Sequence, residues 1–310
     1  MKSKVYHRSL PAMGTLLDVV CLGNGATQFD VIFQAIEKAV SQLEEKWSNY
    51  KSNSTISRIN KSLLTHSQAE VPQDIFRALK QVHRVSQNTD GLFNCWGGQK
   101  YNKQKFSEAI EHENYELTAP HLSDIIFDEA KSTIVSRNSN AQIDSGGFGK
   151  GLAINAVREI LDSYKVHDAL ISFGGSSIYA KGQHPYGPYW PISIPHYYKS
   201  DSHALELKLY TTCVSISGHH PGQRKVKPHG HVFHPENKHP VDRNRVAIVH
   251  GPDAVTAEVL STAFLMAPSN RMTSIAQAFS LYAIYVLTYD EGHEVNLTFK
   301  SIEHEEVTQA

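Results

Sequence analysis

Residues 142–161 read QIDSGGFGKGLAINAVREIL, a glycine-rich turn that leads directly into a helical pattern. Gln142-Ile143-Asp144 predicts the end of a strand, and apolar residues between Leu152 and Ile160 recur at helical spacing. Glycines in such a turn let the backbone approach a ligand, and a helix N-terminus beside Lys150 favours a phosphate. The spacing fits neither a P-loop nor the dinucleotide fingerprint. Two interpretations stay open: a phosphate-binding turn, or a tight strand–helix turn with a surface lysine.

On both sides of this turn, strands and helices follow one another without strict alternation. A polar segment, Ser48 to Ser67, separates the first two helices, and no linker rich in Pro, Gly or Ser divides the chain. The pattern therefore predicts an α+β fold, with residues 1–310 forming a single domain. The expected helices are 29–47, 72–88, 149–164, 253–266 and 271–280. The expected strands are 15–22, 123–128, 132–137, 168–173, a short one after Gly175, 188–195, 204–210, 212–217, 245–250, 282–288 and 295–300.

The composition excludes several classes of protein. The 310 residues carry 30 Lys and Arg against 31 Asp and Glu, a net charge of −1, which argues against nucleic-acid binding driven by overall charge. The hydrophobic fraction of 40% and the charged fraction of 20% exclude a disordered chain. Three distant cysteines without a C-x-x-C pair argue against a disulfide framework.

The N-terminal sequence lacks the pattern of a signal peptide. Its basic residues are followed by an apolar run that Pro11, Gly14 and Asp18 interrupt. The longest apolar stretch, residues 278–288, is too short to span a bilayer. We therefore expect no transmembrane segment and a cytoplasmic location, or a periplasmic one if a leader was removed.

Two further segments contain candidate site residues. Glu258 and Thr262 are four residues apart on an expected helix and share a face, and their oxygens suit Mg²⁺ or Ca²⁺. The alternative is a solvated Glu and a Thr that bonds back to its own helix. The glycine pair in Ser172-Phe-Gly174-Gly175-Ser176 indicates either a bulge or a close backbone approach to a ligand.

Two other features leave their interpretation open. The polar loop 218–244 contains six histidines, which fits a transition-metal site or a solvated loop that holds one general base. Tyr50 follows the end of the first helix and could stack on a flat ring or fill a corner of the core.

Taken in order, the motifs resemble those of the FAD:protein FMN transferases, the ApbE-like flavin transferases, over almost the whole chain. The matching segments are Met13-Gly-Thr15, Trp47-Ser-Asn-Tyr50 with Ser54 to Asn60, Thr89 to Phe93, Asp144 to Gly151, Phe173-Gly-Gly175, Ser217-Gly218, His231 to Pro235 with Pro240-Val241, and Ala257 to Ala263. The resemblance implies a mixed α/β architecture with a flavin cleft between two packed lobes.

The resemblance also implies an activity. Members of the family use Mg²⁺ to cleave FAD and attach FMN through a phosphoester to a Thr or Ser of an acceptor flavoprotein, releasing AMP. It implies that FAD contacts Met13, Tyr50, Leu92, Phe93, Asn94, Asp144, Lys150, Gly174, Gly175 and Val232. The implied metal ligands are the carbonyl of Gly147 and the side chains of Glu258 and Thr262, and the implied base is His231.

The chain departs from the family pattern at six positions. Asn94 and Ser176 replace acidic residues, and Glu258 replaces an Asp metal ligand. Ile216, His234 and Lys238 stand where the family has Thr, Asp and Gly. Besides an active transferase, these changes leave two alternatives: a diverged, non-enzymatic member that binds FAD, and a histidine-rich metal-binding protein on the same scaffold.

Overall fold

A large antiparallel sheet is the centre of the molecule. The computed structural model describes residues 4–23, 25–97, 120–218, 244–301 and 307–308. In this part of the chain the sheet has eight strands in the order β1-β2-β6-β7-β10-β11-β12-β13, and every neighbouring pair is antiparallel. The strands are β1 (Val5–Ala12), β2 (Thr15–Leu22), β6 (Ala169–Phe173), β7 (Ser177–Lys181), β10 (Thr212–Gly218), β11 (Arg245–Gly251), β12 (Ala283–Tyr289) and β13 (Val295–Lys300).

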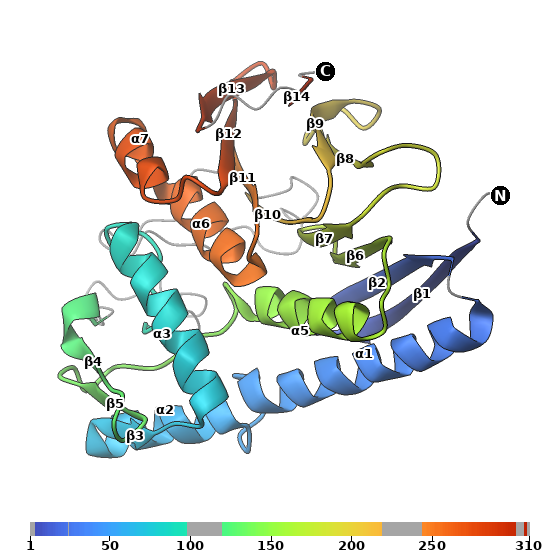
Figure 1. The fold of residues 1–310 in the computed structure, drawn as a ribbon. Coiled ribbons are helices and arrows are strands. Elements are labelled where there is room, and N and C mark those ends of the chain that lie inside the picture. The colour runs from blue at the N-terminus through green and yellow to red at the C-terminus, as the bar shows by residue number, and fades with distance from the viewer. Residues whose placement is uncertain (1–3, 24, 98–119, 219–243, 302–306, 309–310) are drawn as a thin grey trace.

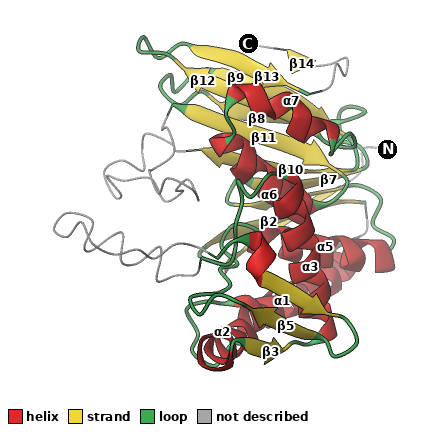
Figure 2. Ribbon diagram, turned by 90° about the vertical axis from the view of Figure 1, so that its left-hand side faces the viewer, coloured by secondary structure: helices red, strands yellow, loops and turns green. Residues whose placement is uncertain are grey.

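Two three-stranded sheets and a set of helices complete the described fold (Figures 1 and 2). The small sheets have the orders β14-β9-β8 and β3-β5-β4. The first sheet consists of β8 (Trp190–Pro195), β9 (His203–Leu209) and β14 (Val307–Thr308). The second consists of β3 (Gln68–Glu70), β4 (Ile125–Asp128) and β5 (Thr133–Ser136), and a 3-10 turn, η1 (Leu122–Asp124), directly precedes β4. The helices are α1 (Ala26–Trp47), α2 (Thr55–His66), α3 (Gln73–Asn88), α5 (Gly149–Ser163), α6 (Ala254–Met266) and α7 (Ser269–Gln277).

Helix α6 is the helix most enclosed by the fold. It packs against β10 and β11 on the sheet and against α5 and α3 beside it (Figure 1). Successive residues of β11 point to opposite faces of the sheet: Ala247 and Val249 join the core under α6, while Val246 and Ile248 join the core under β8 and β9. Enclosure on every side explains why α6 has no solvent-exposed polar face, and Thr262 is its one residue that is not buried.

The structure confirms the α+β class and most of the expected elements, but corrects the sequence interpretation in several places. Strands β1, β3 and β14 were not expected, and the polar segment Ser48 to Ser67 contains helix α2. Helix α2 buries only Ile56, Ile59 and Leu63, so its apolar stripe is narrow. The strand expected at 142–144 is wrong, because Gln142 makes only an isolated bridge with Gly97. No helix among the described residues combines the length and hydropathy needed to cross a bilayer.

Candidate functional site

Two tight turns meet at one end of the large sheet. Met13 and Gly14 join β1 to β2 with φ angles of 50° and 73°, and Gly174 and Gly175 join β6 to β7 with φ angles of 57° and 70°. The amide of Gly174 donates to the carbonyl of Leu16 at 2.9 Å, so the turns lie side by side. The glycine pair is therefore a hairpin turn rather than a bulge within a strand.

The N-terminus of α5 begins with the Asp144–Gly151 turn. The amide of Asp144 donates to the carbonyl of Cys95 at 2.8 Å, and its carboxylate accepts from the amide of Gly146 at 2.9 Å. A Cβ on Gly147 would collide with the ring of Phe93, and one on Gly151 would collide with the α6 backbone at Ala254. Close packing thus accounts for two of the glycines in this turn.

Lys150 points from α5 toward β7 and α6. Its Nζ donates to the hydroxyl of Ser176 at 2.6 Å and lies 3.8 Å from Oε1 of Glu258. Its side chain is 27% exposed. The interpretation of Lys150 as an ordinary surface lysine is wrong, since its ammonium is held between two groups of the site.

Glu258 is a buried carboxylate with defined partners. It is only 5% exposed, which excludes the solvated glutamate considered from the sequence. Its Oε2 accepts from the amide of Gly151 at 2.7 Å, and its Oε1 accepts from the hydroxyl of Ser177 at 2.5 Å. Burial raises the pKa of the Glu258 carboxyl, while the Lys150 ammonium, the Ser177 hydroxyl and the Gly151 amide act in the opposite direction.

A chain of hydroxyl groups extends from Glu258 along α6. Ser261 Oγ donates to the carbonyl of Glu258 at 3.1 Å and lies 2.9 Å from Ser215 Oγ and 2.8 Å from Ser217 Oγ. Ser217 Oγ in turn lies 3.3 Å from Thr262 Oγ1. Strand β10 therefore brings two serines to the helix face on which the metal was expected, which the sequence analysis did not foresee.

This donor set fits a hard cation. Carboxylate and hydroxyl oxygens are the ligands that Mg²⁺ prefers, and the carboxylate of Glu258 keeps lone pairs beyond its two hydrogen bonds. Within the described residues no three His, Cys, Asp or Glu side chains gather as a metal cluster. A cation here would therefore depend on Glu258, hydroxyl groups such as that of Thr262, and backbone carbonyls such as that of Gly147.

The remaining predicted contact residues differ in what they can offer a ligand. Leu92 and Phe93 are buried in the core. The Asn94 side chain donates to the carbonyl of Pro120 and accepts from the amide of Trp96, both at 2.9 Å. Residues 92–94 can therefore offer a ligand their backbone groups, because their side chains are engaged within the fold.

Tyr50 and the histidine loop have different outcomes. Tyr50 is 86% exposed, so it is not a corner of the core and its ring is open to solvent. His231 and Val232, together with His234, Lys238 and the other loop histidines, lie outside the described residues. Their assigned roles stay predictions.

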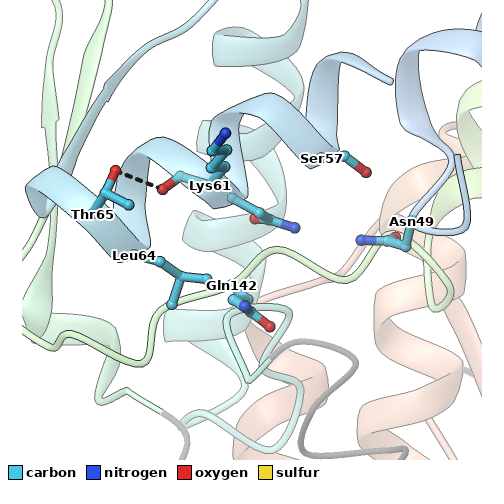
Figure 3. A pocket seen from close by; sticks show the side chains of 7 residues that line it. Asn49, Ser57, Lys61, Leu64, Thr65 and Gln142 are labelled. Carbon is cyan, nitrogen blue, oxygen red and sulfur yellow. Dashed lines mark hydrogen bonds between the residues drawn. The ribbon is translucent and has the colours of Figure 1, made fainter. Parts of the chain in front are cut away.

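A polar hollow of about 290 Å³ lies beside α2 (Figure 3). It contains none of the predicted contact residues, but Asn49 precedes Tyr50 and Gln142 lies two residues before Asp144. The sequence analysis did not predict this hollow, because α2 and Gln142 are far apart in the sequence and come together only in the folded chain. The residues that line it are Asn49, Ser57, Asn60, Lys61, Leu64, Thr65 and Gln142.

The fold is that of solved flavin transferases. The flavin transferase ApbE from Vibrio cholerae matches with a TM-score of 0.78 at 18% identity, over 96% of this chain and 97% of that one. The apo flavinyl transferase ApbE of Pseudomonas stutzeri matches with a TM-score of 0.78 at 21% identity, over 97% and 95%. At these identities the likeness shows the fold alone.

Sequence comparison gives the family. The FAD:protein FMN transferase of Haemophilus influenzae is 23% identical over 309 residues, covering 94% of this chain and 89% of that protein. The sequence model described as the ApbE family matches residues 13–285. The chain therefore belongs to the ApbE family, which confirms the resemblance and the expectation of a transferase.

Proposed function

We propose that this chain is a Mg²⁺-dependent FAD:protein FMN transferase. It would cleave the pyrophosphate of FAD and join FMN through a phosphoester to a Thr or Ser hydroxyl of an acceptor flavoprotein, with AMP leaving. The observation that carries this proposal is the convergence of Lys150, buried Glu258 and the hydroxyl of Thr262 at the end of the sheet. The turns at Met13 and Gly174 lie at the same end.

Each proposed role follows from the chemistry of phosphoryl transfer. A bound Mg²⁺ supplies positive charge to phosphate oxygens, and Glu258, Thr262 and the Gly147 carbonyl would hold it. The ammonium of Lys150 is placed to bind a phosphate oxygen with a charge-assisted hydrogen bond. His231 is the proposed base for the acceptor hydroxyl, since a neutral imidazole titrates near neutral pH.

The departures at Asn94 and Ser176 are compatible with this proposal. Ser176 accepts a hydrogen bond from Lys150 without neutralising its charge, which leaves the ammonium available for a phosphate. Asn94 forms hydrogen bonds within the fold. Glu258 still reaches the site with its longer side chain. No observation among the described residues favours a non-enzymatic FAD-binding member.

The proposal is tested by incubating the purified chain with FAD, Mg²⁺ and an acceptor domain that a relative is known to flavinylate. We expect in-gel flavin fluorescence on the denatured acceptor and release of AMP, both lost with EDTA. FAD binding, followed separately by flavin fluorescence, distinguishes a transferase from a binding module. Binding without AMP release would favour the non-enzymatic alternative.

A further inference from the structure

The peptide on either side of Asp144 is held by two asparagine side chains. Asn60 on α2 pairs with both backbone groups of Ile143: its Oδ1 accepts from the Ile143 amide at 2.7 Å, and its Nδ2 donates to the Ile143 carbonyl at 2.9 Å. This arrangement replaces the neighbouring strand that a ladder would supply. It explains why the backbone groups of Ile143 are paired although residues 142–144 form no strand.

Asn49 binds the same peptide and the residue that follows Asp144. Its Nδ2 donates to the Ile143 carbonyl at 2.6 Å, and its Oδ1 accepts from the amide and the hydroxyl of Ser145 at 3.0 and 2.9 Å. The amide of Asp144 itself donates to Cys95. Every backbone amide from Ile143 to Ser145 therefore has a fixed partner, and two of the three partners are asparagine oxygens.

The end of α1, a few residues before Asn49, also holds the turn at Met13. Glu44, on the last turns of α1, accepts from the amide of Met13 at 2.5 Å. Met13 has a φ of 50°, a left-handed conformation that residues with a side chain seldom adopt. A carboxylate that bonds this amide stabilises the turn in that conformation.

We propose that Glu44, Asn49 and Asn60 are positioning residues for flavin binding, and that they act only through the backbone of Met13 and of Ile143–Ser145. This inference rests on the proposed function, which places Met13 and Asp144 against FAD. The three residues span seventeen positions, from the end of α1 through the connection into α2. The corner between these two helices therefore holds both the Met13 turn and residues 143–145. Asn49 and Asn60 also line the polar hollow, whose labelled side chains come from α2, Asn49 and Gln142 (Figure 3).

Substitutions that keep the shape of the side chain separate this role from simple packing. Asn60→Asp and Asn49→Asp retain the acceptor oxygen but place a second acceptor against the Ile143 carbonyl. We expect each to weaken FAD binding by about 5- to 150-fold, because a carboxylate oxygen then faces the Ile143 carbonyl in place of a donor. Glu44→Ala removes the acceptor of the Met13 amide and is expected to weaken FAD binding in the same range.

The readouts distinguish positioning from catalysis and from stability. At saturating FAD, kcat of the Asn variants should stay within about threefold of the wild type, so the loss appears in KM. Asn155→Ala is the matched control, because Asn155 also bridges two elements, with bonds to Asp253 and Ala254 rather than to Met13 or residues 143–145. It should lower the Tm without changing the Kd for FAD.

Hydrogen exchange at the amides of residues 143 and 145 tests the contacts without flavin. Exchange should be faster in Asn60→Asp and Asn49→Asp than in the wild type and in Asn155→Ala. Wild-type FAD affinity in both Asn variants, or an equal loss in Asn155→Ala, would overturn the inference. If the wild type binds no FAD while the exchange result holds, the corner is structural and the proposed function itself is wrong.

Discussion

Glu258→Gln separates the chemical role of Glu258 from its structural role. Glutamine has the same length, so its oxygen can accept from the Gly151 amide while its NH₂ donates to the Ser177 hydroxyl, which accepts instead of donating. Both contacts keep a partner, and only the charge is lost. That charge is the property that a Mg²⁺ ligand needs.

The expected effect on stability is small because two contributions oppose each other. The substitution removes the ion pair between Lys150 Nζ and Glu258 Oε1, which are 3.8 Å apart. Because the Lys150 side chain is partly exposed, this pair contributes about 0–1 kcal/mol to the free energy of unfolding. Against this, burial raises the pKa of Glu258, so its ionised form is disfavoured in the fold and the neutral amide removes that penalty. We expect the free energy of unfolding at pH 7 to change by about 1 kcal/mol or less, a Tm shift of about 2–4 °C.

The pH dependence of stability shows whether ionised Glu258 stabilises or destabilises the fold. A carboxyl whose pKa is raised by folding contributes stability below its unfolded pKa, and that stability is lost as the pH rises through its folded pKa. The wild-type protein without metal should therefore lose stability relative to Glu258→Gln as the pH rises. Mg²⁺ should reverse the order at neutral pH, because binding the ionised carboxylate stabilises only the wild type.

The assay compares calorimetric Tm and FMN transfer, each with and without Mg²⁺, in the wild type, in Glu258→Gln and in Glu159→Gln, a matched change on the exposed side of α5. We expect transfer to fall by about 10²-fold or more only in Glu258→Gln, since the proposed cation loses its carboxylate ligand. Wild-type transfer and Mg²⁺ response in that variant would refute the reasoning. So would a collapse of the fold, because Glu258 would then be chiefly structural.

Three further changes test other parts of the site. Lys150→Ala should weaken FAD binding by about 1–3 kcal/mol in a fluorescence titration, through loss of a charge-assisted contact, and an unchanged Kd would contradict its role. Gly147→Ala should lower the free energy of unfolding by about 1–3 kcal/mol in a denaturant titration, because the added methyl group collides with Phe93. Gly149→Ala is the control, since its methyl group meets only ordinary contacts, and equal losses in the two variants would exclude this packing. His231→Asn should reduce transfer by about 10²- to 10⁴-fold in the in-gel fluorescence assay with little change in FAD affinity, and near-normal transfer would reassign the base.

Periodicity in the sequence predicted the helices whose apolar stripe is wide. Helix α2 was missed because its three buried residues, Ile56, Ile59 and Leu63, are separated by polar residues, so the stretch was interpreted as a polar segment. The strand expected at 142–144 was wrong for a tertiary reason. Asn60, more than eighty positions away, occupies the groups that a neighbouring strand would have bonded.

For the site, the sequence predicted residue types better than it predicted contacts. The sequence left Glu258 as either a cation ligand or a solvated residue, and the structure shows that it is buried. The partners of Glu258 could not be predicted, since Gly151 and Ser177 come from α5 and β7. The glycines were interpreted mainly as room for a ligand, whereas Gly147 and Gly151 make room for Phe93 and α6.

Mass spectrometry of an acceptor domain, after incubation with the wild-type chain, FAD and Mg²⁺, tests the proposed transferase activity most directly. The account predicts one FMN on a Thr or Ser of the acceptor, AMP in equal amount, and loss of both products with EDTA or in Glu258→Gln. A wild-type chain that binds FAD but produces neither modified acceptor nor AMP, under conditions in which a relative flavinylates the same domain, would contradict it.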